Sequence, residues 1–171
     1  MADETRWSLA WAERPPEEAR IFNPAFCGEL IGRTVCEYHR TCQSPLGMAT
    51  AFLILPLTLH KPTRDALPGR ANTAFAGWIA ERAALLAELP DRARRLRPIS
   101  REALLFAVRH QLLAIEKGGL VPGAKPVRVN ARPAVTTDEV TTARSAAGLL
   151  GRWFAGQGTQ ASILQGMGVA P

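Results

Sequence analysis

Residues 44–59, with the sequence SPLGMATAFLILPLTL, form the longest apolar stretch of the chain. Ser44 and Pro45 are typical of a helix start, because serine caps free amides and proline is tolerated in the first turn. The residues from 46 to 59 are apolar on every side of a helix, which is typical of a helix buried all round. The stretch therefore predicts a central core helix over 46–59. Pro56 has no amide hydrogen to donate, so this helix should kink or end within a turn of it.

Amphipathic helices are predicted on both sides of this segment. Asn23 followed by Pro24 marks a helix start, and the apolar residues behind it recur at spacings of three and four. The sequence HKPTRDALPGR at residues 60–70 indicates turns with one short helix at 63–67. Three further helices are expected: one capped by Asn72 or Thr73 and stopped by Pro90, one that begins at residues 98–100, and one that begins at a capping box of Thr136 and Glu139.

Residues 112–130 predict a small β-hairpin. Gly118 and Gly119 separate two short apolar runs, which is typical of a tight turn between strands. Pro122 and Pro126 cannot donate to a strand ladder, so the second arm should be a loose edge. The fold class is therefore mainly α with a small, wing-like β-hairpin (α+β). We expect an N-terminal arm at residues 1–22 and a single helical domain at residues 23–171.

Length and composition exclude several classes of protein. A chain of 171 residues and 18.5 kDa fits one domain, and 47% apolar residues can fill its core. No stretch reaches the roughly 20 apolar residues that a bilayer helix needs, and the first residues lack the pattern of an export signal. We expect a cytoplasmic protein that makes no membrane contact and keeps its three cysteines reduced.

The charge pattern is compatible with an acidic partner. The net charge is +6 with 18 arginines and 3 lysines, and five arginines lie between Arg92 and Arg101. Arginine is well suited to carboxylate and phosphate groups, although an arginine-rich composition also follows from GC-rich codons. Nucleic acid is therefore a possible partner but not a necessary one.

The sequence contains no pattern that demands an enzyme. Cys36, His39 and Cys42 are metal-ligating residue types at short spacing, but helical geometry spreads the two cysteines about 120° apart. The glycine pairs lack the lysine and hydroxyl of a phosphate loop, and no nucleophile motif is present. We expect no catalytic residue, no metal and no cofactor.

Two clusters are candidate contact sites. The first comprises His60, Lys61, Arg64 and Arg70, which follow the core helix. These side chains can complement the carbonyl end of that helix, or they can contact a phosphate or a protein partner.

The second cluster lies at residues 151–154, where Phe154 belongs to the apolar seam of the last helix and Arg152 and Trp153 point elsewhere. Trp153 is expected either to be an exposed interface anchor or to pack on the neighbouring hairpin. Trp7 and Trp11, four residues apart in the arm, can dock on the body or on a partner.

Several strings at fixed order resemble one protein family. They are FNPAFC at residues 22–27, LPLTLHKPTR at 55–64, LP at 67–68, Trp78, GRWFA at 151–155 and GVAP at 168–171. Together they resemble the middle component of bacterial three-component ABC systems. The resemblance spans residues 13–171 and implies no catalytic residue.

The resemblance implies a non-enzymatic adaptor between two partners. They are an ABC ATPase, related to chromosome-handling and repair ATPases of the SMC type, and an effector-bearing protein of the same operon, in conflict with phages and other mobile elements. Analogy with winged-helix partners of related ATPases favours a winged-helix-like domain. The alternative is a stand-alone winged-helix-like nucleic-acid-binding protein, with contacts from residues 61–70 and 92–101.

Overall fold

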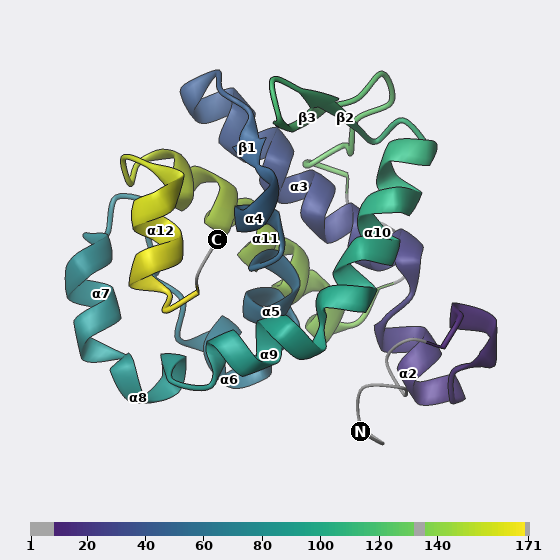
Figure 1. Cartoon of the computed structure of the whole chain (residues 1–171), viewed down its shortest axis with the longest axis horizontal. Coiled ribbons are helices and arrows are strands. Elements are labelled where there is room, and N and C mark those ends of the chain that lie inside the picture. Colours follow the sequence, from purple (N-terminus) through teal and green to yellow (C-terminus); the bar gives the residue numbers. More distant parts are fainter. Residues whose placement is uncertain (1–8, 132–135, 170–171) are drawn as a thin grey trace.

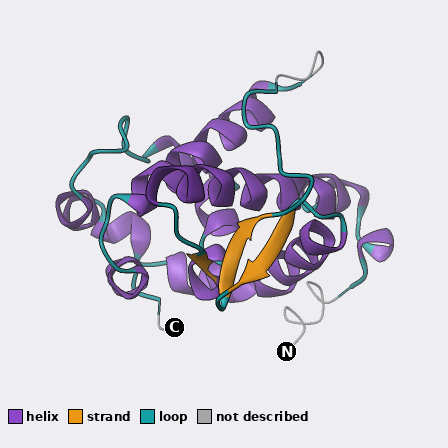
Figure 2. Ribbon diagram, turned by 90° about the horizontal axis from the view of Figure 1, so that it is seen from above, coloured by secondary structure: helices purple, strands orange, loops and turns teal. Residues whose placement is uncertain are grey.

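The computed structural model describes residues 9–131 and 136–169 and shows a mainly helical protein with a small antiparallel sheet (Figures 1 and 2). This confirms the predicted mainly helical class. The elements are, in chain order, η1 (Trp11–Glu13), α2 (Pro16–Ile21), α3 (Pro24–Cys42), β1 (Leu46–Gly47), α4 (Met48–Ala51), α5 (Ile54–Thr58), α6 (Lys61–Asp65), α7 (Phe75–Glu81), α8 (Ala83–Leu86), α9 (Leu89–Arg95), α10 (Arg97–Arg109), β2 (Leu113–Glu116), β3 (Gly119–Pro122), α11 (Asp138–Ala155) and α12 (Gln160–Gly166).

The long helix α3 lies at the centre, and α10 and α11 pack along it (Figure 1). It begins as predicted: Asn23 Oδ1 accepts hydrogen bonds from the amides of Ala25 at 2.8 Å and Phe26 at 3.3 Å. These bonds satisfy amides that have no partner inside the helix. The apolar face of α3 contributes the fully buried side chains of Cys27, Leu30, Ile31 and Val35 to the core.

Helix α11 approaches α3 closely at Gly151. An ideal Cβ atom at this position would lie 2.8 Å from the Cβ of Glu37 and 2.9 Å from the amide nitrogen of Tyr38. Any side chain would therefore push the two helices apart. Next to this point, Thr34 Oγ1 donates to the carbonyl oxygen of Ala147 at 2.9 Å, which fixes the two helices against each other.

The prediction of one core helix over residues 46–59 is wrong, because the segment divides into β1, α4 and α5. Pro56 has no amide hydrogen, so the carbonyl of Phe52 receives no helical bond from it. At the break, the amides of Phe52 and Leu53 donate three residues back, to Ala49 at 3.2 Å and Thr50 at 3.0 Å. The predicted burial is confirmed for α5, in which every residue from Ile54 to Thr58 is buried.

The prediction of a helix from Asn72 or Thr73 to Pro90 is also wrong. Its cap is Ala74, and the segment forms α7 and α8 before α9 begins at Leu89. Pro90 lies in the first turn of α9, and Pro98 lies in the first turn of α10. Proline is tolerated in a first turn, where its missing amide has no helical partner to lose. Pro90 therefore starts a helix here instead of stopping one.

The predicted hairpin is confirmed, and it belongs to a three-stranded sheet. Strands β2 and β3 pair antiparallel from Leu113 opposite Pro122 to Glu116 opposite Gly119. Lys117 and Gly118 form the turn with φ angles of 50° and 77°, as a two-residue turn of type I′ requires. The order is β1-β3-β2, so the expectation that the second arm is a loose edge is wrong. Strand β1 pairs only with the residues before Pro122, so the proline breaks no bond of that ladder.

Among the described residues, no helix is both long and apolar enough to cross a membrane.

The last long helix begins one residue later than predicted, because Thr137 rather than Thr136 caps α11 and accepts from the amide of Val140 at 3.3 Å. The side chain of Glu139 is then free to pair elsewhere.

Candidate functional site

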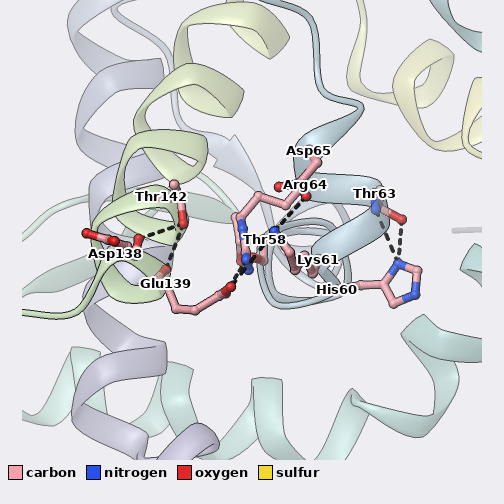
Figure 3. Close-up of polar contacts among 9 residues, drawn as sticks. All are labelled: Thr58, His60, Lys61, Thr63, Arg64, Asp65, Asp138, Glu139 and Thr142. Atoms are coloured by element: carbon pink, nitrogen blue, oxygen red, sulfur yellow. Dashed lines mark hydrogen bonds and ion pairs between the residues drawn. The ribbon is translucent and has the colours of Figure 1, made fainter.

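A buried arginine links the turn after α5 to the amino end of α11 (Figure 3). Arg64 Nη1 donates to the carbonyl oxygen of Thr58 at 2.9 Å, and Nη2 forms an ion pair with the carboxylate of Glu139. The Thr58 carbonyl lies in the last turn of α5, where carbonyls lack helical partners. Arg64 thus stabilises a helix end, which is the first of the two roles that the sequence allows for this cluster.

His60 caps helix α6. Its Nδ1 lies 2.7 Å from Thr63 Oγ1 (Figure 3). The same hydroxyl accepts from Arg92 Nη1 at 3.1 Å. Burial and the nearby Arg92 charge lower the pKa of His60. A neutral imidazole is thereby favoured, while the Thr63 hydroxyl joins α6 to Arg92 of α9.

Lys61 and Arg70 are the exposed members of the cluster. Lys61 Nζ pairs with Asp65 at 2.8 Å and lies 3.9 Å from Glu139 Oε1. The hydrogen bond to Asp65 raises the pKa of Lys61. The structure therefore brings Lys61 and Arg64 together at Glu139, but it does not bring all four predicted side chains to one surface.

The prediction of an exposed Trp153 is wrong. The side chain is 0% exposed, and its Nε1 donates to the carbonyl oxygen of Thr73 at 2.8 Å. Its ring centroid lies 5.1 Å from that of Phe75 and 5.0 Å from that of Trp78. These two ring contacts show that α7 covers the Trp153 side chain of α11. The alternative of packing on the hairpin is wrong as well, because the covering element is α7.

Arg152 lies beside a cavity of about 840 Å³ that is bounded by α3, α11 and residues 129–131. Its Nη1 lies 3.4 Å from Glu37 Oε1. The other two arginines in the wall, Arg33 and Arg144, each place Nε 2.8 Å from Glu29 Oε1. Burial raises the pKa of Glu29, but hydrogen bonds from the two arginines outweigh it and leave the pKa below its ordinary value. The charges around this cavity are thus largely paired.

Of the two tryptophans predicted to dock the arm, the structure describes only Trp11. Trp7 lies outside the described residues. Trp11 is 41% exposed, and its Nε1 donates to the carbonyl oxygen of Ala19 at 2.6 Å within the same arm. Its role in binding a partner stays a prediction.

The arm is joined to the body by Arg14, which the sequence reasoning missed. Arg14 is 8% exposed; its Nη2 pairs with Glu102 Oε2 at 2.6 Å, and its Nε donates to the carbonyl oxygen of Leu9 at 3.0 Å. Between the arm and α10 lies a groove of about 430 Å³. The groove contains Arg97 and Arg101 of the predicted arginine run, together with Leu105.

The candidate metal ligands of α3 do not come together. In the part of the chain that the structure describes, no three His, Cys, Asp or Glu side chains are grouped as a metal ion requires. The three cysteines are free thiols. Burial raises the pKa of Cys27 to about 12 and also raises that of Cys36, so both favour the protonated thiol.

The geometry defines a mainly helical protein whose inner arginines are paired and whose outer arginines on α10 face a groove. A family model described as ABC-three component (ABC-3C) system Middle Component 3 matches residues 11–171. The chain therefore belongs to the Middle Component 3 family of ABC-three component systems. No curated protein and no solved structure matches it.

Proposed function

We propose that the protein is a non-enzymatic adaptor in the cytoplasm that bridges an SMC- or repair-like ABC ATPase and an effector-bearing protein. The observation that carries this proposal is the family match over residues 11–171, since a middle component implies two others. The proposed setting is bacterial defence against phages and other mobile elements. The candidate contacts that remain accessible are Trp11, Arg152, Lys61 and Arg70.

Coexpression with the two neighbouring gene products tests the adaptor role. We expect the tagged chain to retain both partners through size-exclusion chromatography, and to be required for the ATPase and the effector to co-purify. Omission of the chain is the matched control. If the ATPase and the effector associate equally well without it, or if neither binds it, the adaptor proposal fails.

A nucleic-acid-binding module, winged-helix-like in the form that the sequence suggested, is the second candidate. The observation that favours it is the exposure of Arg94, Arg95, Arg97 and Arg101 on α9 and α10. Contacts with phosphate release counterions, so log K should fall by about 0.9 per phosphate contact for each unit of log salt. Titration of a labelled DNA duplex at several salt concentrations measures this slope. A flat profile, or no binding at low salt, removes this candidate.

A further inference from the structure

The groove between the arm and α10 is already formed in the isolated chain. Its volume is about 430 Å³, and one wall is the segment at Leu9 and Ala10 while the other is the outer face of α10. Arg14 ties the two walls together through its ion pair with Glu102 at 2.6 Å and its bond to the Leu9 carbonyl at 3.0 Å. A partner that enters it meets a surface that needs little ordering, which favours affinity.

Each wall of the groove presents an exposed leucine. Leu105 of α10 is 64% exposed and Leu9 of the arm is 39% exposed. One exposed leucine is unremarkable on a protein surface, but two that line one groove give a partner apolar area to bury. Trp11 and Ile21 are two further exposed apolar side chains of the arm.

The charge of the groove is positive. Its acidic side chain, Glu102, is engaged by Arg14. Arg97 and Arg101 are exposed, and neither forms an ion pair with any described residue. Arg97, Arg101, Leu105 and Arg109 follow one another at intervals of four, so they form one exposed ridge along α10.

We propose that this groove binds an acidic amphipathic segment of a protein partner. Carboxylates of the segment pair with Arg97 and Arg101, while its apolar side chains cover Leu105 and Leu9. A nucleic acid would satisfy the arginines, but its phosphates would gain nothing from Leu105 and Leu9. The inference rests on the proposed function, because the partner is one of the other two components of the system.

Cross-linking from the groove identifies the segment. A photoreactive benzophenone amino acid replaces Leu105 in the full chain, which is coexpressed with the two other components and irradiated. We expect mass spectrometry to find a cross-linked partner peptide that alternates apolar and acidic residues. A cross-link to nucleic acid, to a basic peptide, or only to residues 1–8 of the same chain overturns the proposal.

Charge reversal in the groove tests the same contact independently. The double variant Arg97→Glu/Arg101→Glu and the single variant Leu105→Asp should each reduce partner capture on the order of tenfold or more. Matched controls on exposed positions outside the groove are Arg95→Glu in α9 and Ile115→Asp in β2, and both should capture as wild type does. Because all these positions are exposed, the melting temperatures should stay within about 3 °C of wild type.

The outcomes separate this inference from the adaptor role. If the wild-type chain captures a component and the groove variants capture it equally well, the groove inference is overturned and the adaptor role stands. If the wild-type chain captures neither component, both proposals fail. Loss of capture in the groove variants alone, with melting temperatures preserved, supports the inference.

Discussion

The α3–α11 interface and the outer face of α10 both carry arginines, but the two regions differ in how those arginines are satisfied. At the interface, Arg144 places two nitrogens at 2.8 Å from the two carboxylate oxygens of Glu29, and Arg33 shares the same carboxylate. On α10, Arg97 and Arg101 face solvent without an ion pair to any described residue.

The difference shows which part of the positive charge is structural. A charge withdrawn from water needs a partner, so the inner arginines come with carboxylates. An exposed arginine needs none, and its charge stays available to another molecule. The net charge of +6 is therefore a poor guide to a binding surface until the paired arginines are set aside.

The largest effect on stability is expected in the aromatic cluster of Trp153, Phe75 and Trp78. Trp153→Ala should lower the free energy of unfolding by about 3–5 kcal/mol, because it leaves a cavity beside Phe75 and Trp78 and an unpaired Thr73 carbonyl. Trp11→Ala, at an exposed tryptophan, is the control and should change stability far less. Urea denaturation measures both. Equal stability of the two variants would contradict the assignment of Trp153 to the core.

The next largest effect on stability is expected at Gly151, where α11 approaches α3 closely. Gly151→Ala should destabilise the chain by about 1–3 kcal/mol, since the new methyl group meets Glu37 and the α3 backbone. Gly77→Ala in α7 is the matched control, because nothing lies within 4 Å of its ideal Cβ, and it should stabilise the helix by up to about 1 kcal/mol. Thermal melts of both variants check the opposite signs. A neutral Gly151→Ala would mean that the helices can separate freely.

The sequence predicts the elements that depend on local signals. Asn23 with Pro24 specifies a helix start, and the glycine pair at Gly118 indicates a hairpin turn, although the turn is formed by Lys117 and Gly118 while Gly119 belongs to β3. The apolar run at residues 46–59 predicts that this segment is buried, but it does not predict that the segment divides into a strand and two helices. Strand β1 forms by pairing with Leu120, more than 70 residues later in the chain. Tertiary pairing of this kind leaves no periodic signal in the sequence.

The candidate site also depends on tertiary contacts that local sequence patterns do not predict. Helical spacing predicts that Trp153 points away from the apolar seam of the last helix, but spacing cannot reveal that α7 covers this side chain. The groove also depends on a long-range contact, since Arg14 and Glu102 are 88 positions apart. Its detectable signal was the spacing of four that places Leu105 between Arg101 and Arg109 on one helical ridge.

A smaller, pH-dependent effect is expected from Glu29. Its pKa lies below the ordinary value of 4.5, so the carboxylate adds stability that is complete above that value and is lost as the pH falls through the folded value. The side chain is partly exposed, so the contribution at pH 7 should be about 1 kcal/mol.

Glu29→Gln should therefore lower stability at neutral pH, and its difference from wild type should shrink as the pH falls below 4.5 and through the lowered pKa of Glu29. Urea denaturation across this pH range measures the convergence. Glu116→Gln, at an exposed position on β2, serves as the control and should change stability far less at neutral pH. A constant difference between wild type and Glu29→Gln at all pH values would show that the carboxylate charge is not what stabilises the interface.

The smallest effect is expected on the outer face of α10. Arg101→Gln keeps most of the side-chain length and removes a charge that has no ion-pair partner among the described residues, so stability should change by less than about 0.5 kcal/mol. Arg144→Gln removes a similar side chain from a two-point contact with Glu29 and should cost about 1–2 kcal/mol. Parallel urea denaturation of the two variants measures the contrast directly. If Arg101→Gln were the more destabilising of the two, the Arg101 charge would stabilise the folded chain. The outer face of α10 would then have a structural role instead of being a surface available to a partner.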